Sequence, residues 1–200
     1  YTCISIRNTP QISRETWSSF FKLLGRTGPS TRGPVSIPLA SLKVLDLSGN
    51  KLGDEAAGLI LELLHEKDSG CCVEKLDLSG NRIGRGANVV RVLKSYIEYY
   101  RYDQLQGAST RNSWKSSLHT LNLAENDLFL GQVALEIFGL LQNNALGLKY
   151  LDLSNNGLEG DPYQLIAGSL PKNAALAHLN LSGNKFSLPL VDYILHHLTD

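Results

Sequence analysis

His65, Cys71 and Cys72 lie close together in the chain and have side chains of the type that binds zinc. A structural zinc site usually needs four such ligands around the metal. Two adjacent cysteines cannot both reach one ion comfortably, and a fourth ligand is missing. The neighbouring His196 and His197 would project about 100° apart on a helix, so they do not converge on one ion either. We therefore predict no metal site and no other cofactor.

The carboxylates Asp46, Asp77 and Asp152 recur at equivalent places in the chain. General acid or base catalysis would need a proton-accepting partner beside them, and the sequence places none there. The phosphate-binding pattern GxxxxGK[ST] does not occur, so nucleotide hydrolysis has no phosphate cradle. Asn180 begins an Asn-Leu-Ser glycosylation pattern, but it is expected in a strand of a chain without an export signal. The prediction is a protein that is not an enzyme.

The composition indicates a folded protein that binds neither nucleic acid nor membranes. The chain has 200 residues, 42% of them hydrophobic, with 19 basic and 19 acidic side chains. This apolar fraction suits a continuous core, which excludes a disordered chain. Zero net charge removes the electrostatic attraction that nucleic-acid binders and polybasic membrane proteins depend on. No uncharged apolar run is long enough to predict a membrane span.

The N-terminal residues show no signal peptide, and the cysteines form an odd set of three. Both features predict a cytoplasmic protein without a disulfide framework. Methionine is absent from the 200 residues, even at the first position. We therefore expect the sequence to be part of a longer chain or assembly.

Leucine accounts for 37 residues, and its spacing is periodic. The pattern LxxLxLxxNxL occurs in five segments, which span residues 42–52, 73–83, 118–128, 148–158 and 176–186. Only Val73, Ile83 and Phe186 replace leucine in its apolar slots. The segments start 31, 45, 30 and 28 residues apart, which indicates a repeat with one insertion in the second unit.

Each unit contains the signals of a strand, a turn and a helix. Leu45 and Leu47 alternate with polar residues, which predicts a short strand with one buried face. Asn50 is placed to hydrogen-bond the backbone of the turn that follows, and stacked copies could pass such bonds from unit to unit. Helical spacing comes next, with Asp54 as a cap before Ala56, Leu59, Ile60, Leu63 and Leu64. Later helices are predicted to begin at Asp161-Pro162 and to span 187–198.

The pattern resembles the leucine-rich repeat family, in particular its ribonuclease-inhibitor-like class, and more distantly the repeats of RanGAP, tropomodulin and NOD-like receptors. The resemblance covers residues 41–200. It implies a right-handed α/β solenoid, with parallel strands on a concave face and helices on a convex face. The chain departs from the ribonuclease inhibitor because all five ninth slots hold asparagine, whereas that protein alternates asparagine and cysteine.

A degenerate unit is predicted before the five clear ones. Ile4 and Ile6 would form its strand, Ile12 would anchor its turn, and 13–24 would form a helix with Trp17 on its apolar face. We expect a single domain over 1–200. Its parts are 1–40, which includes a Gly/Pro loop, and the repeats 42–72, 73–117 with an insertion, 118–147, 148–175 and 176–200.

In this architecture the strand positions that alternate with the leucines point to solvent. The residues at the third and fifth positions, or slots, of the eleven-residue pattern therefore form two rows across the sheet. The third-slot row contains Val44, Lys75, Thr120, Tyr150 and His178, and the fifth-slot row contains Asp46, Asp77, Asn122, Asp152 and Asn180. A partner would meet a polar, weakly acidic surface that becomes aromatic toward Tyr150 and His178. From these rows we select Asp46, Lys75, Asp77, Asn122, Tyr150, Asp152 and His178 as partner-binding residues. The alternative is that the aspartates and asparagines only belong to the framework of the repeat.

Two segments interrupt the period. In the insertion, Tyr96, Tyr99 and Tyr100 follow helical spacing and are predicted to contact a partner, since tyrosine is common at interface hot spots. They could instead cover neighbouring helices. Residues 25–38 form a loop rich in glycine and proline, either a basic arm for a partner or a surface insertion.

We predict a non-enzymatic interaction module or scaffold, which binds a protein partner of unknown identity through the concave face and the tyrosine-rich insertion. The resemblance to RanGAP implies an alternative, in which the chain stimulates GTP hydrolysis by a small GTPase. The resemblance to tropomodulin and NOD-like receptors implies a third, in which it is a cytoskeletal or innate immune receptor repeat domain. The sequence at 52–55 is of a type seen in all three groups and does not separate them.

Overall fold

The computed structural model describes residues 2–24, 42–65, 73–84, 118–128, 148–160 and 173–186, together with Pro189. The strands are β1 (Thr2–Ser5), β2 (Leu42–Asp46), β3 (Lys75–Asp77), β4 (Thr120–Asn122), β5 (Tyr150–Asp152), β6 (Glu159–Gly160), β7 (His178–Asn180) and β8 (Lys185–Phe186). The helices in these ranges are α1 (Arg14–Leu24) and α2 (Gly53–His65). The helix predicted from Asp161, the tyrosine-rich insertion and the Gly/Pro loop lie outside the described residues, and so does the helix predicted over 187–198 except for Pro189.

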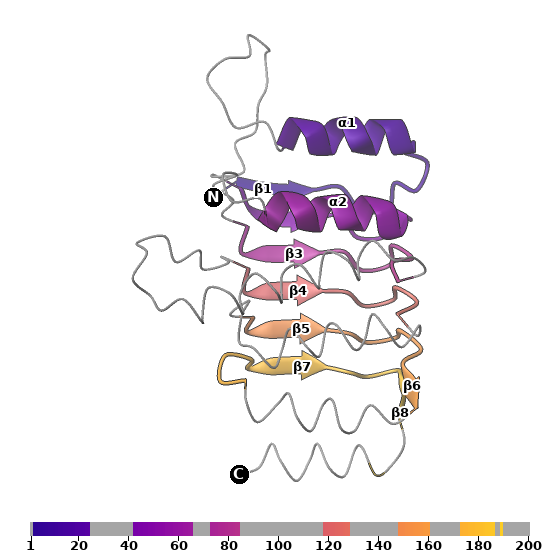
Figure 1. Cartoon of the computed structure of the whole chain (residues 1–200), viewed down its shortest axis with the longest axis vertical. Helices are drawn as coiled ribbons and strands as arrows, with labels where there is room; N and C mark the ends of the chain where they lie inside the picture. Colours follow the sequence, from indigo (N-terminus) through magenta and orange to yellow (C-terminus); the bar gives the residue numbers. More distant parts are fainter. Residues whose placement is uncertain are drawn as a thin grey trace, which may run out of the picture.

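Six strands form one open parallel sheet in the order β1-β2-β3-β4-β5-β7, so successive units lie side by side (Figure 1). The register of the strands matches the repeat, because the first strand leucine of each unit pairs with that of the next unit. These leucines are Leu45, Leu76, Leu121, Leu151 and Leu179. The predicted parallel strands of an α/β repeat fold are therefore confirmed. A second, two-stranded parallel pair, β6 and β8, follows the turns of the last two units and was not predicted.

The leucine slots build the core. In the first four clear units every one of them is buried, as Leu45, Leu78 and Leu151 illustrate with exposures of 1% or less. In the last unit Leu176, Leu179, Leu181 and Phe186 are only partly buried against that core. The buried side of the sheet is therefore the leucine side, as the alternation of residues predicts.

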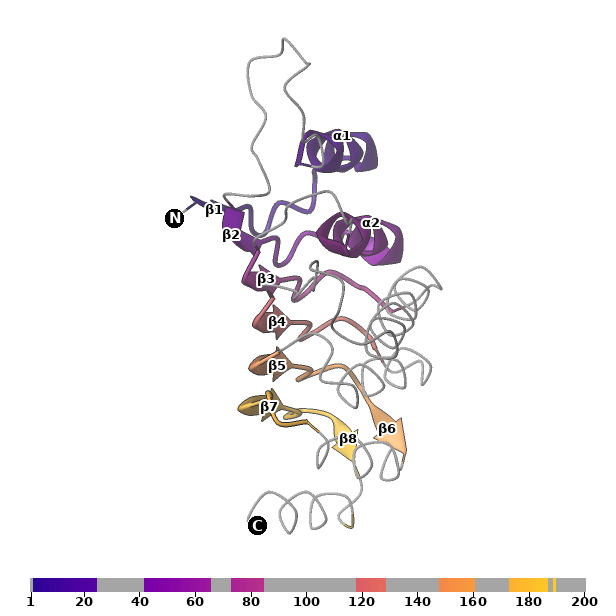
Figure 2. The same ribbon diagram turned by 60° about the vertical axis from the view of Figure 1, so that its left-hand side comes forward.

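Both described helices pack on the leucine side (Figure 2). The Ser13 Oγ accepts a hydrogen bond from the Thr16 N–H, at 3.2 Å, and so caps α1. Helix α2 begins at Gly53, so Asp54 lies in its first turn and not at the cap position predicted for it. In the first turn the negative charge of Asp54 still stabilises the helix N-terminus. Leu59, which the helical spacing of the sequence groups with Ile60, is 39% exposed, because Ala57, Ile60 and Leu61 take the positions toward the core.

The asparagine of the ninth slot links each unit to the one before it. The Oδ1 of Asn126 accepts the backbone N–H of Asn81 at 2.9 Å, and its Nδ2 donates to the Leu78 carbonyl at 2.8 Å. Equivalent bonds join Asn50 to Asn81, Asn126 to Asn156, and Asn156 to Asn184. These bonds satisfy backbone groups that turns would otherwise bury without partners, so the predicted asparagine ladder is confirmed.

The degenerate first unit joins the same ladder with a different residue. Ile4 lies in β1 and pairs with Leu45, as predicted, whereas Ile6 follows the end of the strand at Ser5; both pack against the core. Its ninth slot holds Thr9, whose N–H and Oγ1 both donate to Asn50 Oδ1, at 2.8 and 2.7 Å. The first unit therefore caps the asparagine ladder with a threonine.

Gly84 sits where two units approach closely, and replacing it by alanine is expected to lower the free energy of unfolding by about 2–3 kcal/mol. Its φ is 100°, a conformation that a Cβ disfavours. A Cβ there would also lie 2.8 Å from Leu128 Cδ2 and 3.2 Å from Leu128 Cα. Urea unfolding monitored by circular dichroism measures the loss.

Gly53 supplies the matched control, because its φ is also positive, at 74°, but a Cβ there would meet no atom within 4 Å. Gly53→Ala should therefore lose only the conformational part, about 1 kcal/mol. Equal losses in the two variants would show that Leu128 moves aside without cost.

Candidate functional site

We call the face of the sheet opposite the helices the strand face. It carries two rows of side chains. Since Leu45 points into the core, its neighbours Val44 and Asp46 point the other way. Strand pairing aligns the third-slot row in one line, with Cys3 added by β1, and the fifth-slot row in another, with Ser5 added. The seven partner-binding residues predicted on the strands are therefore gathered on one face, whereas Tyr96, Tyr99 and Tyr100 lie outside the described residues.

The fifth-slot row holds the turns that follow the strands. The Oδ1 of Asp77 accepts both the N–H and the hydroxyl of Ser79, at 2.9 and 2.7 Å. Asp46, Asp152 and Asn180 make the same pair of bonds to the serine two residues later, and Asn122 accepts the Ala124 N–H. An acceptor in this slot therefore stabilises each turn, and this is a framework role.

The remaining polar atoms of the fifth-slot row bind one another. Asn122 Nδ2 donates to Asp77 Oδ2 at 3.0 Å, and Asn180 Nδ2 donates to Asp152 Oδ2 at 2.9 Å. Asp46 has another aspartate beside it in the register, and its Oδ2 is held by the Nε of Arg7 at 2.9 Å. Each of the two asparagines thus binds one oxygen of a neighbouring aspartate, Asn122 separates Asp77 from Asp152, and most of the hydrogen-bonding capacity of the row is used.

Asp152 is the most enclosed member of the row, with an exposure of 8%. Burial alone would raise the pKa of its carboxyl, but hydrogen bonds from Ser154, Asn180 and Tyr150 outweigh it and lower the pKa. The same neighbourhood acts on Tyr150 in the opposite sense. Burial first, then the charge of Asp152 and the hydrogen bond to it, raise the pKa of the Tyr150 phenol.

Asp152→Asn is expected to lower the free energy of unfolding at pH 7 by about 1–2 kcal/mol, because an amide cannot accept from all four donors that the carboxylate binds. The lowered pKa means that the wild-type carboxylate stabilises the fold above the ordinary Asp pKa and loses this effect as the pH falls through the folded-state value. The gap between the two proteins should therefore be present at pH 7 and shrink below about pH 4. Urea unfolding at a series of pH values measures it; a gap that does not change with pH would contradict the assignment.

The third-slot row is chemically mixed and more open than the fifth-slot row. Lys75 and His178 are exposed, while Val44, Thr120 and Tyr150 are half-buried. The rings of Tyr150 and His178 lie 6.1 Å apart, tilted by 44°. The row therefore presents the cation Lys75 on β3 and the aromatic pair of Tyr150 and His178 on β5 and β7.

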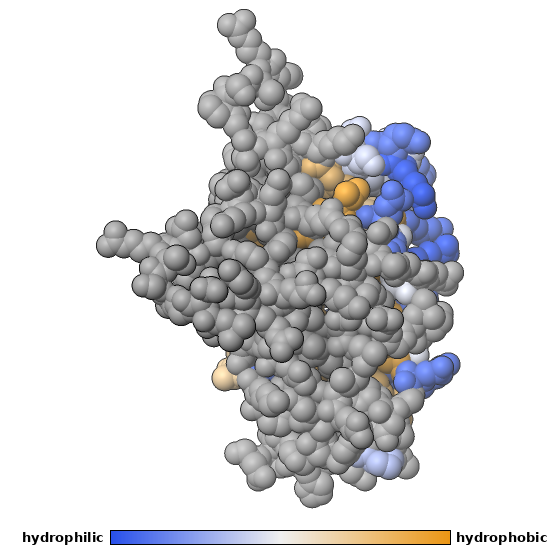
Figure 3. Space-filling view, in the orientation of Figure 1, coloured by the Kyte–Doolittle hydropathy of each residue, from blue (hydrophilic) through white to orange (hydrophobic). Residues whose placement is uncertain are grey.

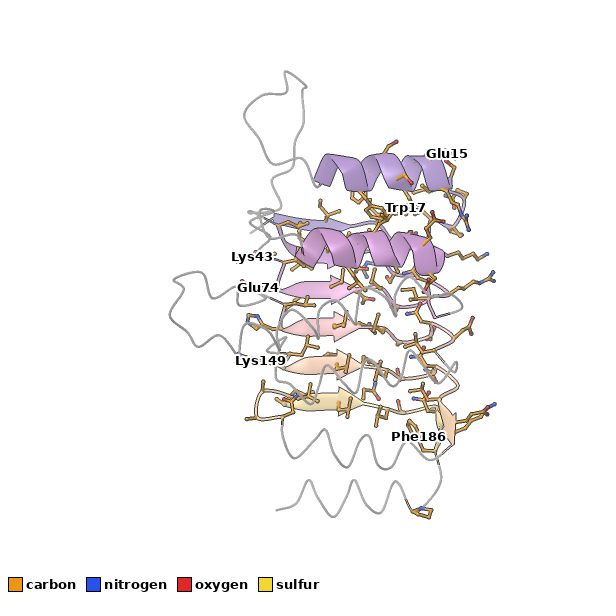
Figure 4. All side chains as sticks on the ribbon, in the orientation of Figure 1. Glu15, Trp17, Lys43, Glu74, Lys149 and Phe186 are labelled. Carbon is orange, nitrogen blue, oxygen red and sulfur yellow. The ribbon has the colours of Figure 1, made fainter. Side chains whose placement is uncertain are left out.

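Two polar contacts at this sheet were not predicted. The first is the ion pair of Arg7 with Asp46. The signal for it was the alignment of the first unit through Ile4 and Ile6, which places Arg7 directly after the strand. The second is the ion pair of Lys43 with Glu74 at 2.8 Å, at the start of the strands (Figure 4). The hydrogen bond from Lys43 is the main reason that the pKa of Glu74 is lowered.

Among the residues that the structure describes, no group of three or more histidine, cysteine or acidic side chains could hold a metal ion. Cys71, Cys72, His196 and His197 lie outside these residues. Within the same ranges no helix is both long and apolar enough to cross a membrane.

Comparison with protein-family models gives two matches, both described as leucine-rich repeats. One covers residues 39–61 and 71–85, and the other covers 147–168. The chain contains leucine-rich repeats. These matches fall on the first, second and fourth clear units, and the register of β4 and β7 places the other two in the same stack. None of the curated proteins matches the chain. Leucine-rich repeats are generally protein-interaction modules, which supports the broad class predicted from the sequence.

Proposed function

We propose that this leucine-rich repeat chain is a non-enzymatic interaction module that binds a protein partner through the third-slot row of its strand face. The observation that carries the proposal is the contrast between the two rows. The fifth-slot row is occupied with its own turns and neighbours, whereas Lys75 and His178 in the third-slot row are exposed to solvent. Recognition therefore falls to the third-slot row.

The chemistry of this row suits a protein surface. Neighbouring strands are about 4.8 Å apart, so the row offers a new side chain at each step along a partner. Tyr150 and His178 form an aromatic platform with polar edges, the type of group enriched at the energetic centres of interfaces. Asp77 and Asp152 lie beside Tyr150 and add negative charge, while Lys75 adds positive charge further along. A partner with a mixed, complementary surface fits this arrangement better than a uniformly charged one.

We also propose that the whole chain is one right-handed solenoid of the ribonuclease-inhibitor-like class, with the strand face on its concave side. The repeat of about 30 residues and the 13-residue helix α2 that follows β2 support this class, which alternates strands with full helices. In that arrangement Asp46, Asp77, Asn122 and Asp152 support the binding row from beside it, and the tyrosine-rich insertion remains a second predicted contact. A cytoplasmic location goes with the proposal.

The test is affinity capture with a tagged chain and its triple variant Lys75→Ala, Tyr150→Ala and His178→Ala, quantified by mass spectrometry. The proposal predicts that one or more proteins captured by the wild type are depleted at least tenfold by the triple variant. Equal recovery with both chains would exclude the third-slot row. A second arm, Tyr96→Ala, Tyr99→Ala and Tyr100→Ala, tests the insertion separately.

Two controls make the result interpretable. The triple variant should keep the thermal midpoint of the wild type within a few degrees, since its three side chains lie outside the core. The captured proteins should also be tested for GTP hydrolysis with and without the chain. Acceleration of a small GTPase would support the RanGAP-like alternative over a module that only binds.

A further inference from the structure

A groove lies between α1 and α2, on the opposite side of the sheet from the strand face. It has a cavity of about 70 Å³, lined from the α1 side by Ile12, Arg14 and Trp17 and from the α2 side by Lys51, Ala56 and Leu59, among others. Figure 3 shows apolar surface between the two helices next to a strongly hydrophilic rim. The volume exceeds what one water molecule needs and is sufficient for a small side chain.

The groove exposes apolar surface that the core does not use. Leu59 is the large hydrophobic side chain that is exposed in the described part of the chain, at 39%. Its place on the flank of α2 puts it in the wall of the groove beside Ala56. A partly covered apolar wall of this kind gains stability when an apolar group is seated on it.

The Trp17 indole ring belongs to the lining of the groove. The Trp17 side chain reaches from α1 toward α2 (Figure 4), and its exposure is only 4%. Its indole N–H is enclosed and has no hydrogen-bond partner in the described part of the chain. Because this nitrogen has almost no accessible surface, a group seated in the groove contacts other atoms of the indole ring rather than its N–H.

The charged side chains at the rim of the groove determine which charge is favoured next to an apolar group bound in it. Arg14 and Glu55 line the groove and lie 3.5 Å from each other, so they largely offset one another. Lys51 also lines it and takes part in none of the ion pairs found among the described residues. The net positive charge of these three side chains favours a carboxylate at the rim.

We infer that the α1–α2 groove is a second docking site, which takes an apolar side chain adjacent to a carboxylate from a protein partner. The side chain packs on Leu59, Ala56 and the Trp17 ring, and the carboxylate pairs with Lys51. The site is independent of the proposed strand-face function, because it uses the other side of the sheet.

A small probe with this chemistry is N-acetyl-L-leucine, which combines an isobutyl group and a carboxylate. Its neutral counterpart N-acetyl-L-leucinamide is the matched control. The readout is the indole N–H resonance of Trp17 in a two-dimensional nitrogen–proton NMR spectrum. The chain has a second tryptophan, Trp114, so the Trp114→Phe variant assigns the resonance.

The inference predicts that the Trp17 resonance shifts and saturates with N-acetyl-L-leucine, with a dissociation constant of about 1–10 mM, as expected for a fragment of this size. The amide should bind at least threefold more weakly. Lys51→Gln should remove the preference for the acid, and Leu59→Ser should weaken both probes; both residues are exposed, so the fold should persist.

Three results would overturn the inference. A Trp17 resonance that moves with neither probe would leave the groove without a ligand of this class. Equal binding of acid and amide to the wild type would remove the role of Lys51. Broadening that grows with protein concentration without any probe, and that Leu59→Ser abolishes, would make a second copy of the chain the occupant instead.

Discussion

Replacing Asn126 by alanine is expected to lower the free energy of unfolding by about 3–5 kcal/mol. The side chain is fully buried and serves four backbone groups: Oδ1 accepts from the N–H of Asn81 and Ile83, and Nδ2 donates to the carbonyls of Leu78 and Ala124. Alanine leaves all of them without this partner in a place that water does not reach. Chemical denaturation of the purified chain, followed by far-ultraviolet circular dichroism, measures the loss.

Asn184 provides the comparison, since it makes the same bonds to the unit before it but is partly exposed. Water can replace some of its hydrogen bonds, so Asn184→Ala should cost clearly less than Asn126→Ala. If the two variants lost the same stability, burial would not be what makes the ladder important.

Leu151→Ala is expected to cost about 2–5 kcal/mol. Leu151 has an exposure of 0% at the centre of β5, and its removal leaves a cavity that the neighbouring strands can fill only in part. Thermal and urea unfolding should both show the loss. A value below about 1 kcal/mol would contradict the strand register, because a shift by one residue would place this side chain on the strand face.

Leu179 is the matched control for Leu151, since the two residues are paired in the register and Leu179 is only partly buried. Leu179→Ala should therefore lose less stability. A smaller effect at Leu151 than at Leu179 would mean that the core is centred on the last unit.

The parallel sheet and its register followed from the sequence because one physical rule is repeated. Leu45, Leu76, Leu121 and Leu151 each come two residues before another leucine, and a strand with one buried face is the simplest structure that covers both. The role of the ninth slot also followed, because an asparagine at a fixed distance from a strand has few alternatives to the turn backbone. Repetition turned weak local signals into a consistent prediction.

The first unit was harder to predict because its residues differ in kind. Thr9 fills the ninth slot with one acceptor and one donor in place of an amide, and a pattern built on asparagine does not detect it. Arg7 was missed for the same reason, although it is the residue that offsets Asp46.

The orientation of α2 about its own axis could not be predicted from the sequence either. Helical spacing places Leu59 and Ile60 on adjacent parts of one apolar face, and only packing against the sheet decides that Ile60 is buried.

The placement of the two rows on one face of the sheet was predicted, but the division of roles between the rows was not. The slots that form the two rows could be read from the alternation around Leu45 and Leu47. That Asp77 would be bound by Ser79 and Asn122 depends on side-chain contacts between units, which alternation does not contain. The framework interpretation of the fifth slot therefore gained support from the structure, and the case for recognition moved to Lys75, Tyr150 and His178.

The dissociation constant of a captured partner tests the central claim most directly. It should be measured by isothermal titration calorimetry for the wild type, for the Lys75→Ala, Tyr150→Ala and His178→Ala triple variant, and for Leu59→Ser on the helix side. The proposal predicts that the triple variant weakens binding at least tenfold with a thermal midpoint within a few degrees of the wild type, while Leu59→Ser leaves the dissociation constant of this partner unchanged. An unchanged dissociation constant for the triple variant would contradict the assignment of the strand face as the binding surface.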